Sequence, residues 1–473
     1  MNLAERPIKR RGTTPASRAT ALLAAAAIMA ASLPAHAQRD PALSLPIVRD
    51  AEIEQLLREY SQPILRTAGL SQQNIRVVII NDRSFNAFVA DGRRIFINTG
   101  ALTEAQVPNE VIGVLAHETG HISGGHLSKM REQLANATTQ SIIATILGAG
   151  AMIAASQSGS ASTRNAGMAA ATAPQEMIRR SLLSYQRAHE EQADRAGVKY
   201  LTATAQSPKG MYDTFSRLAD QMLFSARFAD PYVQSHPMPK ERVAALGELA
   251  QASPYWNKKD SPELQLRHDL MRAKLSGFTE RPDTVARRYP GSDTSLPARY
   301  ARAISAYRHS DLRAAIAQID SLIQTQPNNA YFYELKGQAL LESGQASTAI
   351  APLRRAVQLA PNPALIQVML GQALIAANDP KLAEEAVNLL RSALAREPEV
   401  PEGYTQLAMA YGRKGDLAQA DLASAQAAAA RGDMRTARDL ATRAKTRFPV
   451  GTPGWVKADD IASSKPPKGS KTE

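Results

Sequence analysis

The segment His117-Glu118-Thr119-Gly120-His121 constrains this chain most, because it has the H-E-x-x-H pattern. Residues four apart lie on the same face of a helix, so His117 and His121 can bind one metal ion, for which zinc is well suited. Glu118 points around the helix and can act as general base on water held by the ion. The alternative is a helix whose two histidines merely face solvent or the core. Residues elsewhere in the chain distinguish a metal site from this alternative.

The residues before this motif predict that it lies on a helix. Val111, Val114 and Leu115 form an apolar stripe with helical spacing. Pro108 precedes Asn109, whose side chain we expect to cap the first turn.

The chain has 473 residues and no cysteine. This length allows two or three domains with cores of their own. Without thiolates, a zinc ion must be held by histidine and carboxylate side chains. We expect one zinc ion per chain.

Residues 1–37 predict a secretory signal peptide that is cleaved after Ala37. Basic residues come first, an apolar run over Ala19–Leu33 follows, and Ala35-His36-Ala37 ends the segment. An uncleaved membrane anchor is the alternative, but the apolar run is shorter than the ~20 residues of a spanning helix. Arg10-Arg11 hints at twin-arginine export, yet polar residues follow the pair, so the general secretory route is favoured.

The formal net charge is +12, and loss of residues 1–37, with five basic residues and one acidic residue, leaves +8. This balance supports peripheral contact with anionic membranes or acidic partners. No helix concentrates the basic residues as a nucleic-acid-binding protein would, so we expect no nucleic acid partner.

A small β-sheet is predicted beside the metal helix. Short β-branched runs predict strands, and the residues Asp91-Gly92 predict a turn between the last two. The predicted elements are a helix over Ala51–Thr67 and strands over Val77–Ile80, Phe85–Val89 and Ile95–Asn98. Asn86, Ala87, Phe88 and Val89 are the candidate substrate-binding edge, because an extended peptide can pair with an edge strand. An ordinary hairpin is the alternative.

The third metal ligand is expected on a separate helix around residues 185–194. Glu190 and Asp194 are four residues apart, as a ligand and a supporting carboxylate would need to be. Glu191 and His189 remain alternative donors. His126 is out of register with the third histidine of one zincin class, so it is not expected to bind the ion.

Two further segments could lie over the site. Residues 142–155 are largely apolar and precede a loose small-residue stretch, which predicts either a buried helix or a lid that touches the membrane. His236 precedes Pro237 and is either a plain loop residue or a donor to a developing oxyanion.

Together these residues resemble the M48 family of zinc metallopeptidases over roughly residues 45–250. The family pattern is H-E-x-x-H, then E-x-x-A-D, then H-P followed five residues later by arginine. The chain has His117/Glu118/His121, Glu190 with Asp194, and His236-Pro237 with Arg242. The resemblance implies that Glu190 is the third zinc ligand, that Asp194 and Arg242 support it, and that His236 stabilises the transition state or plugs the zinc in a resting enzyme.

The C-terminal half predicts tetratricopeptide repeats. Small and aromatic residues recur at the spacing of this repeat, at Tyr333, Gly337, Gly344, Ala349, Ala356 and Pro361, then at Gly371, Ala386, Ala393 and Pro398, and again from Tyr404 to Ala427. Stacked helix pairs form a concave surface for peptides or partner proteins. A purely structural arm is the alternative.

The predicted fold is α+β and mostly α, a zincin-like domain with a small sheet followed by an α-solenoid. We divide the chain into a signal peptide (1–37), a metallopeptidase domain (38–254), a helical transition with short helices (255–297), a repeat array (298–456) and a disordered tail (457–473). This arrangement is similar to periplasmic proteases of Gram-negative bacteria. The similarity implies a zinc metalloendopeptidase with a chaperone-like role, whose partners are unfolded or misassembled outer-membrane proteins and the barrel-assembly machinery. A repeat-based adaptor with a closed, latent metal site is the alternative.

Overall fold

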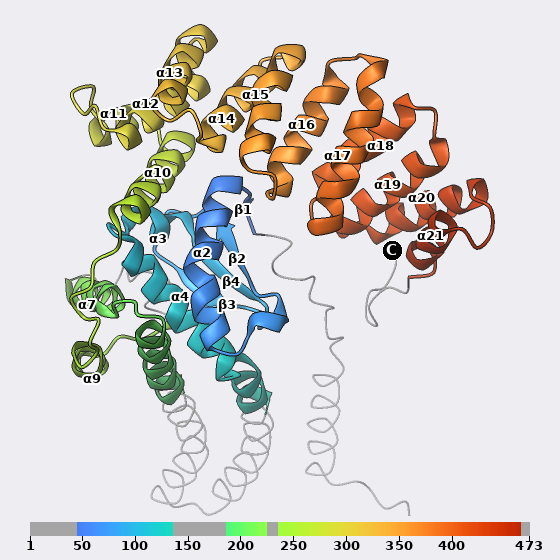
Figure 1. Ribbon diagram of the computed structural model, residues 1–473. Helices are drawn as coiled ribbons and strands as arrows, with labels where there is room; N and C mark the ends of the chain where they lie inside the picture. The colour runs from blue at the N-terminus through green and yellow to red at the C-terminus, as the bar shows by residue number, and fades with distance from the viewer. Residues whose placement is uncertain (1–44, 136–185, 225–234, 465–473) are drawn as a thin grey trace, which may run out of the picture.

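The computed structural model describes residues 45–135, 186–224 and 235–464. The predicted signal peptide and the apolar segment 142–155 lie outside these ranges. Helices surround a small sheet at one end of the described chain, and a curved row of helix pairs follows (Figure 1). The predicted class, α+β with mostly α structure, is therefore confirmed. None of the helices in the described ranges combines the length and apolar composition that crossing a bilayer requires.

The sheet has four strands in the order β1 (Ile47–Val48), β2 (Arg76–Ile80), β4 (Arg94–Asn98) and β3 (Ala87–Val89). β2 runs parallel to β4, whereas β3 and β4 are antiparallel. The hairpin between β3 and β4 is the predicted one, and Gly92 takes a φ of +76° in its turn. β1 was not predicted, because two residues are too few to show a strand pattern.

The motif lies on α4 (Pro108–Ser123), beside α2 (Ala51–Thr67) and α7 (Lys209–Phe224). The predicted cap at Asn109 is wrong, because Pro108 is already the first helical residue and Val107 precedes it. The Asn109 amide instead donates to the Ser207 carbonyl at 2.7 Å, and its carbonyl accepts from the Gly210 amide at 2.8 Å. This side chain therefore joins α4 to the start of α7.

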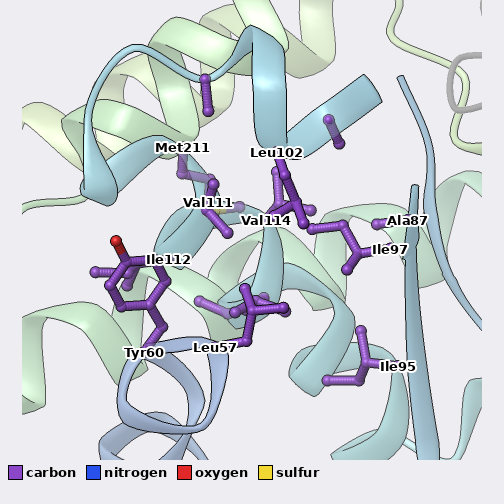
Figure 2. Packing of buried hydrophobic residues seen from close by; sticks show 14 of the residues in the cluster. Leu57, Tyr60, Ala87, Ile95, Ile97, Leu102, Val111, Ile112, Val114 and Met211 are labelled. Carbon is purple, nitrogen blue, oxygen red and sulfur yellow. The ribbon is translucent and has the colours of Figure 1, made fainter. Parts of the chain in front are cut away.

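One hydrophobic core fixes α4 against the sheet (Figure 2). Its side chains include Leu57 and Tyr60 from α2, Ile95 and Ile97 from β4, Val111, Ile112 and Val114 from α4, and Met211 from α7. A Cβ on Gly113 would lie 2.6 Å from the Met211 Cα, so only glycine allows α7 to approach α4 this closely.

Short elements complete the peptidase part, and two helices lead into the repeats. They are η2 (Ser71–Gln73), α3 (Thr99–Glu104), α9 (Lys240–Gln251), α10 (Pro262–Thr279) and α11 (Pro282–Arg288). The expectation of only short helices over 255–297 is wrong for α10, which has 18 residues. Met271 and Leu275 on α10 pack into the peptidase core, whereas Leu270 and Ala273 pack with the first repeat helices. α10 therefore connects both cores.

A buried charge cluster lies at the same junction. Lys274 of α10 is 3% exposed, and its ammonium lies 2.8 Å from Asp50, 3.2 Å from Glu52 and 3.7 Å from Glu334. The hydroxyl of Tyr300 donates to Glu52 at 2.9 Å. These contacts connect α2 with the helices of the repeats.

The repeat helices pack in pairs along the chain. They are α12 (Leu296–His309) with α13 (Leu312–Thr325), α14 (Ala330–Glu342) with α15 (Ala346–Leu359), α16 (Ala364–Ala376) with α17 (Ala383–Arg396), α18 (Pro401–Arg413) with α19 (Leu417–Ala430), and α20 (Met434–Arg447) with α21 (Pro453–Ala462). The insertion near residue 380 forms a 3-10 turn, η3 (Pro380–Leu382), before α17.

The predicted tail boundary at residue 457 is wrong, because α21 extends to Ala462. Ala458 is fully buried in a small core with Leu422 and Ala444. Lys445 of α20 also forms an ion pair with Asp459 at 2.5 Å. These contacts keep the segment helical despite its polar composition.

Candidate metal centre

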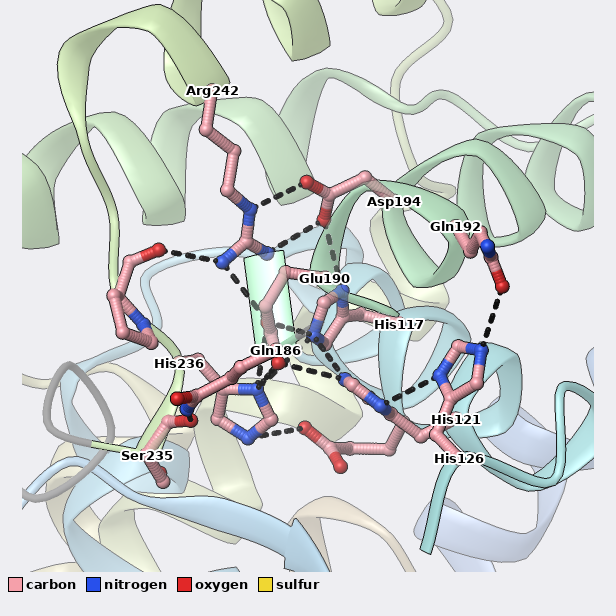
Figure 3. Close-up of polar contacts among 12 residues, drawn as sticks. His117, His121, His126, Gln186, Glu190, Gln192, Asp194, Ser235, His236 and Arg242 are labelled. Carbon is pink, nitrogen blue, oxygen red and sulfur yellow. Dashed lines mark hydrogen bonds and ion pairs between the residues drawn. The ribbon is translucent and has the colours of Figure 1, made fainter. Parts of the chain in front are cut away.

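Four side chains from three segments meet beside the fully buried Glu118. His117 and His121 come from α4, Glu190 comes from the helix over 186–203, and His236 comes from the turn before α9. One ligand atom from each of the four lies within 4.8 Å of the others (Figure 3).

The distances between these atoms fit one tetrahedral ion. The two Nε2 atoms of His117 and His121 are 3.0 Å apart. The Oε2 of Glu190 lies 3.4 Å from the Nε2 of His117, and its Oε1 lies 3.5 Å from the Nε2 of His121. Ligand atoms that bind zinc tetrahedrally at ~2.0 Å lie ~3.3 Å apart. Two imidazoles and one carboxylate at these distances suit Zn²⁺ in both geometry and donor type.

His236 completes the tetrahedron in this arrangement. Its Nδ1 lies 3.4 Å from the Nε2 of His117 and 2.9 Å from a Glu190 oxygen. Its Nε2 lies 3.6 Å from the Glu118 carboxylate. His236 therefore lies between the candidate ion position and the candidate general base.

Small residues bring the two helices close enough for Glu190 to reach the histidines. A Cβ on Gly120 would lie 2.8 Å from the Ala193 carbonyl oxygen, and one on Gly197 would lie 3.3 Å from the His117 amide nitrogen. Ala193 itself is fully buried. Larger side chains at these positions would separate the helices and move Glu190 away from His117.

A buried carboxylate and a buried guanidinium support the site from behind. The Asp194 carboxylate lies 2.9 Å from the Nδ1 of His117, on the ring edge that faces away from His121. Arg242 donates to both oxygens of Asp194, at 2.7 and 2.8 Å, and lies 2.9 Å from Glu190. Burial alone would raise the pKa of Asp194, but the Arg242 charge and its hydrogen bonds lower it. Asp194 therefore stays ionised and can orient His117.

Electrostatics favour a cation among these groups. Burial would raise the pKa of Glu190, but His236, His117 and His121 hold it well below its usual range. Burial would lower the pKa of His117, but the Asp194 and Glu190 carboxylates raise it to about 9. Burial dominates at His121 and lowers its pKa to about 3. Without a metal, the proton on His117 balances the carboxylates, and a divalent ion would replace that proton.

The structure separates the alternative donors that the sequence left open. Glu191 is exposed and is not part of the group of four, whereas Glu190 is 3% exposed and belongs to it. His189 stacks on His126, with ring centroids 4.3 Å apart. His126 contacts the Nδ1 of His121 at 3.0 Å, on the opposite side of that ring from the group of four. Sequence reasoning missed this contact, for which the Gly124-Gly125 pair was the only signal.

The candidate substrate strand lies beside the metal helix. β3 is at one edge of the described sheet and contacts α4. The side chain of Ala87 is fully buried, and Phe88 stacks on Phe96 with ring centroids 5.1 Å apart. Asn86 accepts a backbone hydrogen bond from Asn98 at 2.9 Å. These side chains position the strand, and its outer backbone edge is the part that could pair with a peptide.

Comparisons with known proteins agree with this geometry. Residues 48–250 match the sequence profile of Peptidase family M48, and residues 300–363 match a tetratricopeptide repeat profile. The beta-barrel assembly-enhancing protease of Yersinia pestis is 24% identical over 417 residues, which cover 86% of this chain and 82% of that protein. The protein of the same name from Escherichia coli O157:H7 is 25% identical over 317 residues, or 65% of this chain and 62% of its own length.

Other matches cover less or are more distant. A relative from Vibrio cholerae is 24% identical over 293 residues, 61% of this chain and 59% of its own. The chain thus spans about three fifths of the length of two of these three relatives. The crystal structure of MamA covers 34% of this chain and 90% of its own at 19% identity, but with a TM-score of 0.28 it supports no conclusion. The two profiles and the similarity to the Yersinia protein along most of its length show that this chain contains a Peptidase family M48 domain followed by C-terminal tetratricopeptide repeats.

Proposed function

We propose that this protein is a zinc-dependent endopeptidase of the periplasm that degrades or assists misassembled outer-membrane proteins. The observation that carries the proposal is the spacing of 3.0 to 3.5 Å among the ligand atoms of His117, His121 and Glu190. Glu118 is fully buried beside them on the same helix. This is the donor set and the neighbouring carboxylate that metal-assisted peptide hydrolysis needs.

His117, His121 and Glu190 would hold the ion. Zinc in such a site supplies a Lewis acid that polarises a peptide carbonyl and acidifies a water molecule. Glu118 is placed to accept the proton of the attacking water and to return it to the departing amine. Asp194 fixes the orientation of the His117 ring through its Nδ1.

Within this proposal His236 plugs the site in the resting enzyme. In the described arrangement its Nδ1 occupies the fourth corner of the tetrahedron, so a substrate carbonyl can enter only after this ring moves. The alternative is that His236 donates a hydrogen bond to the developing oxyanion. Arg242 joins the His236 turn to the ligands, because it donates to the Pro237 carbonyl at 2.9 Å while it binds Asp194.

The substrate would bind as an extended strand along β3, beside α4. Its backbone would pair with the outer edge of residues 86–89, which accepts many sequences because the pairing is between backbones.

The clients and the location rest on the relatives and on the repeats. The relatives are named for the assembly of β-barrels, and the repeats here form helix pairs of the kind that bind proteins. The repeats would bind unfolded or misassembled outer-membrane proteins or the barrel-assembly machinery. The positive charge favours peripheral contact with anionic membranes, and nucleic acid is not proposed as a partner.

The test compares zinc content and proteolysis in the wild type and in Glu118→Gln. Both proteins should bind one zinc ion per chain, since Glu118 is not a ligand. Only the wild type should cleave an unfolded outer-membrane barrel protein. Full activity of Glu118→Gln would reject the mechanism.

A second candidate, a repeat-based adaptor with a latent metal site, is favoured by the closure of the site. His117 and Glu118 are fully buried, and His236 fills the fourth corner. This candidate predicts that Glu118→Gln still complements a deletion strain, whereas the endopeptidase proposal predicts that it does not.

A further inference from the structure

The two histidines of α4 are supported in different ways on the ring edges that face away from the site. The Nδ1 of His117 faces the Asp194 carboxylate at 2.9 Å. The Nδ1 of His121 faces the Nδ1 of His126 at 3.0 Å, and the Nε2 of His126 lies 3.2 Å from the Oε1 of Gln192 (Figure 3). A chain of hydrogen bonds therefore leads from His121 through His126 to the helix that carries Glu190.

Ligand chemistry fixes the direction of this chain. A neutral imidazole that gives its Nε2 lone pair to a metal carries its hydrogen on Nδ1. His121 must then donate, and the Nδ1 of His126 must accept. The hydrogen of His126 consequently lies on Nε2 and is donated to the carbonyl oxygen of Gln192. One tautomer of each histidine satisfies both bonds.

The local sequence places His126 for this contact. On a continuous helix, a residue five positions after His121 would lie about 140° around the axis and could not reach its ring. Here α4 ends at Ser123, Gly125 takes a φ of +62°, and a new helical stretch begins at His126, so the helix is not continuous between the two histidines. A Cβ on Gly124 would lie 2.2 Å from the Nε2 of His126, so the absence of a side chain leaves room for the ring.

A second ring holds His126 in this orientation. His189 stacks on it with ring centroids 4.3 Å apart and planes inclined by 4°. Both rings are buried, at 3% and 5% exposure. The turn, the stack and the Gln192 carbonyl together restrict how the His126 ring can lie.

We propose that His126 is a positioning residue that fixes the tautomer and orientation of His121 for metal binding. The inference rests on the proposed zinc-dependent function. Loss of such support to a ligand weakens metal binding about 10- to 100-fold. His126 needs no contact with the ion or the substrate for this role.

The test measures the zinc dissociation constant of the full chain by competition with a chromophoric chelator. His126→Ala should weaken zinc binding about 10- to 100-fold. His126→Asn should restore part of the affinity, because its amide oxygen can accept the hydrogen bond from His121. Gly124→Ala should also weaken binding, because it displaces the His126 ring while a φ of −75° lets alanine keep the backbone. His309→Ala, at an exposed histidine on the repeats, is the matched control and should bind zinc as the wild type does.

If His126→Ala fails to fold, Gly124→Ala still tests the inference. The added Cβ meets only the end of the His126 side chain, so the backbone can stay in place. Wild-type zinc affinity of Gly124→Ala and of a folded His126→Ala, together with loss of zinc in His117→Ala, would overturn this inference and leave the proposed function intact. If the wild type itself bound no zinc, both would fall. If His126 only packs the core, His126→Ala should lower the unfolding temperature of the zinc-free chain, and His126→Asn should not restore zinc affinity. That result would also overturn the inference.

Discussion

The guanidinium of Arg242 forms two parallel hydrogen bonds with the carboxylate of Asp194, at 2.7 and 2.8 Å. The remaining nitrogen of Arg242 lies 2.9 Å from Glu190 and donates to the Pro237 carbonyl. One buried cation thus connects a candidate metal ligand, the carboxylate behind another ligand, and the turn that carries His236. This guanidinium therefore helps to hold the residues of the candidate site in place.

Arg242→Ala should therefore destabilise the protein strongly. It leaves Asp194 and Glu190 buried without their cation, a loss that costs about 3–5 kcal/mol in buried ion pairs. Urea unfolding of the zinc-free protein measures this. Arg242→Lys keeps the positive charge but cannot form the two parallel hydrogen bonds with Asp194, so it should lose less stability than Arg242→Ala. Equal stability of Arg242→Ala and the wild type would contradict the assigned role.

His236→Ala should keep zinc and cleave peptides faster than the wild type. The variant retains His117, His121 and Glu190 but opens the corner that the Nδ1 of His236 occupies. If the closed arrangement outweighs the open one tenfold, removal of the ring raises cleavage up to about tenfold. Cleavage of a short fluorogenic peptide at saturating zinc measures the change. A fall of 100-fold or more would instead assign His236 mainly to oxyanion stabilisation.

Glu334 should make folding stability depend on pH. Burial raises the pKa of Glu334 to about 8. The Lys274 charge lowers this pKa, whereas the negative charges of Asp50 and Glu52 raise it further. Because the pKa is higher in the folded state, ionisation of Glu334 destabilises the folded protein. Its contribution to the free energy of unfolding is therefore fully present below about pH 4.5 and is lost as the pH rises through about 8. The advantage of the wild type over Glu334→Gln in urea unfolding should therefore shrink from pH 5 to pH 9. A difference that stays constant over this range would contradict the buried cluster.

Gly337→Ala should destabilise the repeats, because a Cβ there would lie 2.3 Å from the side chain of Leu353. Overpacking of this kind costs about 1–3 kcal/mol. Gly412→Ala is the matched control, since a Cβ at Gly412 meets no atom within 4 Å in the described structure. Thermal unfolding should show a lower midpoint for the first variant and an unchanged or higher one for the second.

The sequence predicted most of the fold, because its signals are local. The stripe before His117 marked α4, the β-branched runs marked β2 to β4, and the small residues such as Gly337 marked the repeat pairs. The errors came from contacts between distant residues. Asn109 bonds α7 instead of capping its own helix, and burial of Ala458 extends the last helix beyond the expected boundary.

The candidate site was predictable only in part, for the same reason. Helical spacing alone pairs His117 with His121 and Glu190 with Asp194. It does not show that the ring of His126 contacts His121, because this contact depends on Gly124 and Gly125 and on the stacking of His189. The choice between Glu190 and Glu191 likewise depends on which face of their helix packs against α4.

The most direct measurement of the central claim is the zinc content of Glu190→Gln beside that of Glu191→Gln, by elemental analysis of the purified full chain. The two variants make the same chemical change at neighbouring positions, one among the candidate ligands and one exposed. We predict one zinc ion per chain in Glu191→Gln and loss of zinc in Glu190→Gln. Equal zinc content in the two variants would contradict the proposed metal centre.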